Sequence, residues 1–224
     1  MRQAGLVWIA VTGIACADPP AAPLAAGASG GSVSAPDGGI ERSGDASTGE
    51  LQPIERGEAP HAAESAHPQV LRLVTWNIQA GRASSLEAVA QRLATLEPDI
   101  VTLQEVDVDT RRTGRVHQPA LLAQQLGFHY AFAQTIPWSG GKYGIATLSR
   151  YPFAGLRRIP LSNQDAGEPR TALVARVCAA ERCTLVINHH ADVRPLAAAR
   201  STLEIVADLA PELGQGVALL ADLN

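Results

Sequence analysis

The sequence predicts an α/β protein with mixed sheets. From residue 71 onward, short apolar segments rich in β-branched residues alternate with segments whose apolar residues recur at helical spacing. Some neighbouring strand segments are joined by short hairpin-like turns, and others by stretches long enough for a helix, which indicates both antiparallel and parallel pairing. With 224 residues and 46% hydrophobic residues, the chain is long enough for one domain with a substantial core.

The first elements have recognisable boundaries. A strand is expected at 71–77, followed by a helix that starts at a capping box formed by Ser84 and Glu87 and stops before Pro98. The apolar run at 100–105 is typical of a strand buried on both faces. Pro119 in a first turn and Gly127 as a stop delimit a second helix. Further strands are expected at 128–134, 144–149, 171–178, 183–187 and 217–222, with a helix at about 195–209.

Residues 1–16 have the pattern of a signal peptide. Arg2 precedes an apolar run that is too short for a permanent membrane helix. The run ends on Gly-Ile-Ala-Cys, which is similar to a bacterial lipoprotein cleavage box, so Cys16 is the expected lipidation site. The alternative is an ordinary secretory signal. Both predict an exported protein, either a membrane-anchored lipoprotein held by its lipid or a periplasmic or extracellular protein.

Residues 17–69 are expected to be a disordered tether. Within 17–68, Ala, Pro, Gly and Ser fill 33 of 52 positions, and no aromatic residue occurs. Such a segment cannot bury enough apolar surface to offset its ordering entropy. It also has eight acidic residues against two arginines, which accounts for the net charge of -4. The part at 70–224 is close to neutral, which argues against a polybasic protein that binds nucleic acid through bulk charge.

Two cysteines follow the leader. Cys178 and Cys183 flank four residues between two strand patterns, so a hairpin would place them opposite each other. In an oxidising compartment we expect them to form a disulfide. Two free thiols are the alternative for a reducing compartment.

Polar residues stand at the ends of the apolar strands. Strand ends of an α/β sheet converge on one cleft, where such proteins bind ligands. A carboxylate in this place suggests Mg²⁺, with Mn²⁺ as the alternative, because these hard cations take carboxylate, water and phosphate oxygens. The residues concerned are Asn77, Gln104, Glu105, Asn188, His189, His190, Asp222 and Asn224.

Five motifs in this order carry a resemblance to a known family. They are TWNIQAG (75–81), LEPDIVTLQEVD (96–107), YGIATLSRYP (143–152), INHH (187–190) and ADLN (221–224). On these motifs, the segment from about 70 to 224 resembles the endonuclease/exonuclease/phosphatase superfamily, which includes deoxyribonuclease I. The resemblance implies a four-layer α/β/β/α sandwich and metal-assisted hydrolysis of a phosphodiester, in nucleic acid or in a phospholipid head group. No obligate protein partner is evident.

Residue roles follow from the same resemblance. It implies that Glu105 holds Mg²⁺ and that Asn77 helps to place the metal and the phosphate. Asp222 would orient or activate the attacking water, while Asn224 and His190 would bind the phosphate and stabilise its developing charge. Substrate contacts are implied for Arg112, Tyr143 and Arg170.

The match has one large departure. The chain ends at Asn224, whereas family members continue to an Asp-His pair near the C-terminus that takes part in catalysis. We therefore expect a sandwich that is incomplete at the C-terminus, with activity in doubt. The leading prediction is an exported, nuclease-like phosphodiesterase. The alternatives are a sphingomyelinase-like or phosphoinositide-phosphatase-like enzyme and a non-catalytic surface lipoprotein that serves as a binding module.

Overall fold

The computed structural model describes residues 7–12, 53–59, 70–161, 168–179, 182–212 and 216–223, the first of these ranges by its backbone alone. Cys16, Asn224 and most of the range 17–69 lie outside the described residues, so the expectations placed on them stay predictions.

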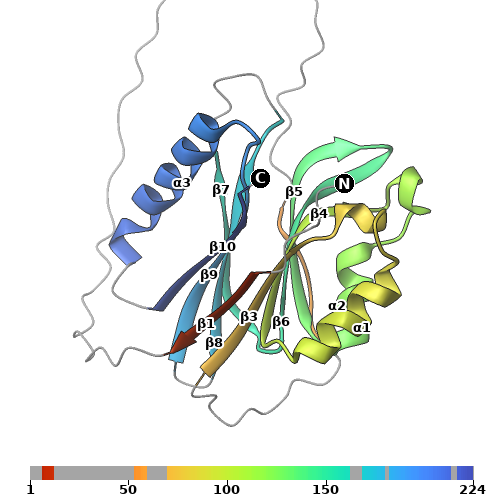
Figure 1. The fold of residues 1–224 in the computed structure, drawn as a ribbon, viewed down its shortest axis with the longest axis horizontal. Helices are drawn as coiled ribbons and strands as arrows, with labels where there is room; N and C mark the ends of the chain where they lie inside the picture. The colour runs from red at the N-terminus through yellow and green to blue at the C-terminus, as the bar shows by residue number, and fades with distance from the viewer. Residues whose placement is uncertain are drawn as a thin grey trace, which may run out of the picture. The chain divides into compact units, whose positions relative to one another are not determined.

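Two mixed sheets form the centre of the fold (Figure 1). The first has the order β1-β3-β4-β6-β5-β2, in which only β3 and β4 are parallel. The second has the order β10-β9-β8-β7, in which only β10 and β9 are parallel. The strands of the first sheet are β1 (Val7–Thr12), β2 (Glu55–Gly57), β3 (Val70–Asn77), β4 (Ile100–Val108), β5 (His129–Trp138) and β6 (Gly141–Ser149). Those of the second are β7 (Phe153–Pro160), β8 (Thr171–Ala179), β9 (Arg182–His190) and β10 (Gly216–Asp222).

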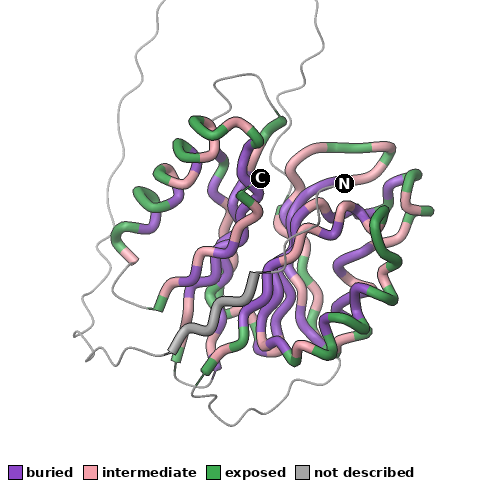
Figure 2. The backbone as a smooth tube through the Cα atoms, in the orientation of Figure 1, coloured by how far each residue is buried: buried purple, intermediate pink, exposed green. Residues whose placement is uncertain are grey.

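Helices cover the outer face of each sheet. Helices α1 (Leu86–Leu96) and α2 (Gln118–Leu126) pack on the first sheet, and α3 (Pro195–Leu209) packs on the second (Figure 1). Their buried sides face the strands and their exposed sides face outward (Figure 2). Short 3-10 helices occur at Gln79–Gly81 (η1), Arg111–Thr113 (η2) and Ala210–Glu212 (η3). Among the described residues, no helix has the length and apolar character to cross a membrane.

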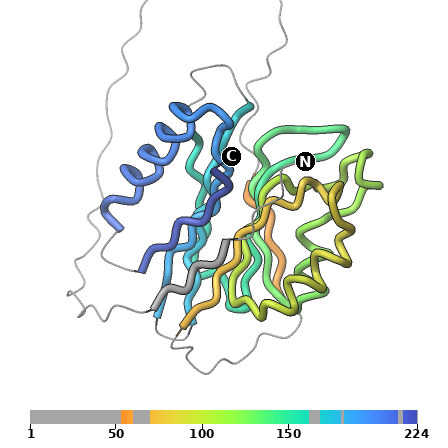
Figure 3. Tube along the Cα trace, viewed as in Figure 1, coloured from red at the N-terminus to blue at the C-terminus, as the bar shows by residue number. Residues whose placement is uncertain are grey.

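The inner faces of the two sheets pack against each other. Leu73 and Ile100 of the first sheet share a core cluster with Val186 and Leu220 of the second. Burial of such side chains stabilises the folded state by about 1.5–3 kcal/mol each. The last strand runs alongside β9 (Figure 3) and also contacts β3, which brings together segments far apart in sequence.

The first helix begins one residue later than its sequence predicts. Ser85, and not Ser84, is the N-cap residue, and its Oγ accepts a hydrogen bond of 3.2 Å from the Ala88 amide. The predicted capping box with Glu87 is therefore wrong, because Ser84 lies one residue before the cap. The helix ends as expected, with Glu97 in the left-handed region just before Pro98.

Three strands have no counterpart in the sequence prediction. Strand β7 was missed because Arg157 and Arg158 interrupt its apolar pattern. Strand β2 pairs with β5 inside the range expected to be a tether, so residues 55–57 belong to the first sheet. Strand β1, within the expected signal peptide, pairs with the outer edge of β3. The β8–β9 hairpin contains the expected bridge, with Cys178 and Cys183 opposite each other and an S–S distance of 2.04 Å.

Candidate active site

The ends of four strands meet at one edge of the two sheets. Asn77 is the last residue of β3, and Glu105 lies late in β4, its parallel neighbour. His190 and Asp222 are the last residues of β9 and β10, and they pair with each other in the parallel register. The sequence-based expectation that these polar strand ends converge therefore agrees with the structure.

A network of buried amide groups, which we term the amide clasp, joins the two sheets directly beneath this edge. It consists of Thr75, Gln104 and Asn188, and the two amide side chains are fully buried. Gln104 Nε2 donates to Thr75 Oγ1 at 3.1 Å and to Asn188 Oδ1 at 2.8 Å. Asn188 Nδ2 donates across the interface to the carbonyls of Leu103 at 3.1 Å and Ala146 at 2.8 Å. Buried polar groups satisfied in this way fix the relative position of the two sheets.

The clasp coincides with an irregularity in β4. Pairing between β4 and β6 shifts register between Leu103 and Val106. Glu105 lies within this bulge and has a φ of 54°, a left-handed conformation that is unfavourable for a residue with a Cβ. Asn188 bonds the two carbonyls that precede the shift, so a side chain from one sheet supports the bulge in the other. The bulge turns Glu105 toward the site rather than into the ladder.

Asn77 connects the two carboxylates of the site. Its Nδ2 donates to Glu105 Oε1 at 2.9 Å and to Asp222 Oδ2 at 2.7 Å. Its Oδ1 accepts a bond of 3.0 Å from the Gln79 amide, which fixes the side-chain orientation. A single amide nitrogen thus brings an oxygen of each carboxylate close together. Two carboxylates gathered around one amide group make this edge locally acidic, which favours binding of a cation there.

His190 lies against this pair as a neutral imidazole. Its side chain is only 7% exposed, and Nε2 is 3.8 Å from Asp222 Oδ2. Burial lowers the pKa of His190, the nearby Arg170 lowers it further, and Asp222 opposes both effects. Arg170 Nη1 lies 3.1 Å from His190 Nδ1. Because a guanidinium can only donate, Nδ1 accepts and the imidazole proton stands on Nε2, on the side of Asp222.

His189 faces the opposite way. It is fully buried, and its Nε2 lies 3.1 Å from the hydroxyl of Ser201 on α3. Burial lowers the pKa of His189 to about 4, so it is neutral at pH 7. The residue therefore ties α3 to β9 rather than reaching the carboxylates.

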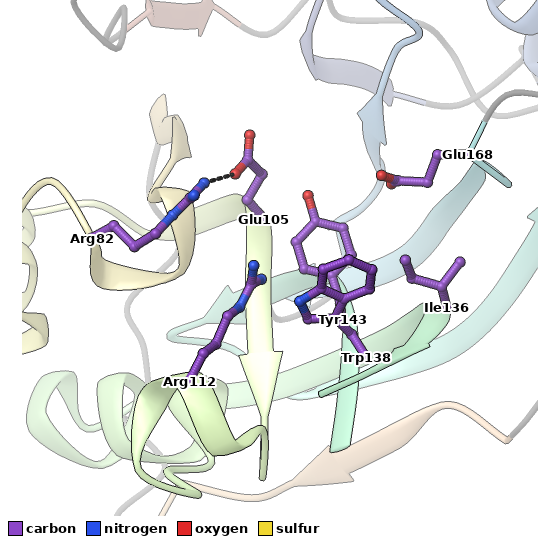
Figure 4. A pocket seen from close by; sticks show the side chains of 7 residues that line it. All are labelled: Arg82, Glu105, Arg112, Ile136, Trp138, Tyr143 and Glu168. Carbon is purple, nitrogen blue, oxygen red and sulfur yellow. Dashed lines mark hydrogen bonds and ion pairs between the residues drawn. The ribbon is translucent and has the colours of Figure 1, made fainter. Parts of the chain in front are cut away.

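A hollow opens beside Glu105 (Figure 4). It encloses about 320 Å³, including open space at its mouth. Figure 4 shows the side chains that line it, namely Arg82, Glu105, Arg112, Ile136, Trp138, Tyr143 and Glu168. Arg82 contacts Glu105 at 3.4 Å and stays largely exposed. Tyr143 keeps its phenolic proton, because burial raises its pKa, and Glu105 and Glu168 raise it further.

Three residues expected to contact substrate take up places around the site. Arg112 and Tyr143 line the hollow, while Arg170 bonds Glu168 at 2.9 Å and approaches His190. Two nitrogens of Arg112 bond both oxygens of the buried Asp107 carboxylate, each at 2.7 Å. The charge of Arg112 is thus largely balanced within the protein, and its contact with a phosphate stays a prediction.

Sequence reasoning missed Arg82, Ile136, Trp138 and Glu168 as lining residues. Trp138 carried a usable signal, since aromatic residues are only 4% of the chain and this one precedes a Ser-Gly-Gly turn. Arg82 and Glu168 carried none, because charged residues in loops are common. Within the described ranges, no group of three or more His, Cys, Asp or Glu side chains could hold a metal.

Residues 74–224 match the model of the endonuclease/exonuclease/phosphatase family. The chain belongs to this family. Members of the family are phosphoric ester hydrolases, and no protein of curated function matches the sequence. The predicted family and the α/β fold are thereby confirmed.

Solved structures show the family fold again. The catalytic domain of human nocturnin, solved with a bound sulfate, is 20% identical, with a TM-score of 0.54 over 69% of this chain and 64% of that one. The mannosyl-6-phosphatase of Bacteroides thetaiotaomicron is 18% identical, with a TM-score of 0.53 and coverages of 68% and 64%. TDP2 of Caenorhabditis elegans is 23% identical, with a TM-score of 0.51 and coverages of 68% and 46%. The chain described here thus spans less than two thirds of the length of each of these structures.

Proposed function

We propose that this chain carries the carboxylate centre of a metal-dependent phosphodiesterase with nuclease-like specificity. The observation that supports it is the position of Asn77, whose single amide nitrogen bonds both Glu105 and Asp222. Phosphoryl transfer depends mainly on positioning and on neutralising charge at the phosphate oxygens. A family member with two linked carboxylates, a buried neutral histidine and nearby arginines has the groups that such a reaction needs.

The donor set suits a hard divalent cation. Glu105 and Asp222 offer carboxylate oxygens, and Mg²⁺ binds through one or two carboxylates and completes its shell with water and substrate. Glu105 would hold Mg²⁺, or alternatively Mn²⁺, with Asn77 and Asp222 beside it. When bound, the ion would supply charge neutralisation at the phosphate. A cation bound there would offset the negative charge of the two carboxylates.

The remaining groups have separate tasks in the proposal. Asp222 accepts hydrogen bonds at the edge of the site and would orient the attacking water. His190 presents its Nε2–H on the same side and would donate a hydrogen bond to a phosphate oxygen. Arg170 holds the imidazole in this tautomer and adds positive charge near the phosphate. Fixed donors of this kind stabilise developing charge more than mobile water does.

Hydrolysis assays on the full chain test the proposal. Single-stranded DNA, plasmid DNA, sphingomyelin and phosphoinositides would be offered with Mg²⁺ and, separately, with EDTA. We expect Mg²⁺-dependent cleavage of DNA and a loss of at least about 100-fold in Glu105→Gln, which keeps the size of the side chain but removes its charge. Glu87→Gln, an exposed glutamate in the first turn of α1, is the matched control and should cleave normally.

Two results would contradict the proposal. One is the absence of metal-dependent turnover on every substrate, and the other is equal activity of Glu105→Gln and Glu87→Gln. Turnover confined to a lipid would retain the hydrolase and replace the nuclease-like specificity.

A further inference from the structure

The hairpin between β5 and β6 holds an exposed aromatic ring beside the site. Trp138, the last residue of β5, is 46% exposed and lines the hollow that also contains Glu105. Trp76, by contrast, packs against the core of the first sheet. An indole ring that is partly open to solvent and lines a hollow offers a flat apolar surface on which a ligand can stack.

The ring contacts an arginine that also lines the hollow (Figure 4). The Arg112 guanidinium lies 5.6 Å from the centre of the Trp138 ring and 5.4 Å from that of Tyr143. Arg112 is fixed in turn by its two bonds to the Asp107 carboxylate, which also accepts a bond of 2.6 Å from Thr110. We term Arg112, Trp138 and Tyr143 the aromatic wall. A wall held in place before binding loses little side-chain entropy when a ligand arrives.

The backbone of the hairpin is also anchored. The Arg111 amide donates a bond of 2.9 Å to the Ser139 carbonyl, which ties the turn to η2. Gly141 packs so closely on Asp109 that an added Cβ would lie 2.4 Å from its carbonyl carbon. Trp138 therefore does not swing freely with a loose turn, and its position beside Glu105 is a property of the fold.

We infer that the hollow binds an unpaired nucleobase stacked on Trp138, which makes single-stranded nucleic acid the substrate class of the site. This inference rests on the proposed function. Stacking on an aromatic side chain requires a base with a free face, and bases inside a duplex have none. The exposed Arg82 across the hollow is placed to attract the adjoining phosphate.

The lining favours a base over a lipid. Four of the seven lining residues are charged, and Ile136 is the one aliphatic residue among them. A phospholipid would bring acyl chains that need continuous apolar surface at the rim. Because Glu105 belongs both to the hollow and to the carboxylate pair, a base stacked here would place its own phosphate next to the proposed reaction centre.

Binding measured in EDTA tests the inference without any turnover. The probe is a fluorescein-labelled oligothymidylate, and its anisotropy would be followed as the full chain is added. We expect Trp138→Ala to weaken binding by about 5- to 150-fold, the range for loss of one base–aromatic stack. Trp138→Phe, which keeps a ring, should retain most of the affinity. Val206→Ala on α3, where the side chain is equally exposed at 46%, is the control and should bind normally.

Competition separates the other ligand classes. Unlabelled single strands should displace the probe, while a duplex of equal length, a hexose 6-phosphate and phosphocholine should not. Unchanged binding by Trp138→Ala, no binding by the unmodified chain, or equal competition by any of the other three ligands would overturn the inference. If Trp138→Ala loses binding while no substrate is hydrolysed, the base-binding site holds, but the proposed function fails and the assignment of a substrate class fails with it. If hydrolysis is intact and Trp138→Ala binds normally, the reverse is true.

Discussion

The amide clasp and the aromatic wall border the same site but are built in opposite ways. The clasp draws on both sheets, is fully buried at Gln104 and Asn188, and has its hydrogen bonds satisfied. The wall belongs to one sheet and to η2, and Trp138 stays open to solvent. The clasp fixes the two sheets relative to each other, whereas the wall lines the hollow and would contact the ligand. Substitutions in the clasp should therefore affect stability first, and those in the wall should affect affinity first.

The largest effect is expected from Asn188→Leu. The change leaves the carbonyls of Leu103 and Ala146 and the amide of Gln104 buried without their partner, and each such group costs about 1–3 kcal/mol. We expect the free energy of unfolding to fall by about 4 kcal/mol, measured by urea denaturation. Gln125→Leu on the exposed side of α2 should change it by less than about 0.5 kcal/mol. A small loss in Asn188→Leu would mean that the clasp does not hold the sheets together.

Arg112→Met should lower the free energy of unfolding, because Arg112 of the aromatic wall also pairs with Asp107. It leaves the fully buried Asp107 carboxylate without its charged partner. Breaking a buried pair costs about 3–5 kcal/mol, and we expect about 3 because the Arg112 side chain is 27% exposed. The neighbouring Arg111→Met serves as the control in the same denaturation experiment. Equal stability of the two variants would contradict this role and would weaken the claim that the wall is rigid.

Acid should destabilise the fold through His189, which ties α3 to β9. Its pKa is about 4 in the folded chain, below the ordinary value of 6.5, so the unfolded chain binds the proton more tightly. The stabilisation is complete above pH 6.5 and is lost as the pH falls toward 4, by about 3 kcal/mol for this shift. Urea denaturation across this range should show a steeper loss for the unmodified chain than for His189→Gln. Parallel curves would contradict the assignment.

The smallest effect on the site should come from the far end of β8 and β9. Replacing Cys178 and Cys183 by serine removes a bridge that closes a short loop, which is worth about 2 kcal/mol of stability. The bridge lies at the opposite end of the hairpin from His190, so oligothymidylate binding should not change. Weaker binding in the double serine variant would show that the site depends on overall stability, and the contrast between clasp and wall would lose its meaning.

The sequence predicted the polar residues at the strand ends of the site better than it predicted the aromatic wall. Asn77, Glu105, His190 and Asp222 could be found because a polar residue that ends an apolar strand is conspicuous, and parallel strand ends meet in space. Trp138 could not be placed in the same way. Its position depends on a register shift in β5 between Gln134 and Ile136, and a bulge leaves no clear mark in the apolar pattern.

The fold shows the same division. Strands β3, β4, β8, β9 and β10 follow clear apolar patterns, and their expected ranges agree closely with the structure. Strand β7 was missed because the partly buried Arg157 and Arg158 interrupt it, and β2 because three residues are too few to show periodicity. Both lie at sheet edges, where pairing with one neighbour decides the structure more than composition does.

The left-handed backbone of Glu105 lowers the stability of the fold, while its carboxylate is needed for the proposed activity. A side chain in this region costs about 1–2 kcal/mol that glycine avoids, so Glu105→Gly should make the chain harder to unfold while removing its central carboxylate. A library selected for heat resistance alone would then enrich glycine at this position and discard the proposed activity. Selection for turnover would restore glutamate. Position 105 would thus report which of the two pressures a population of variants has experienced.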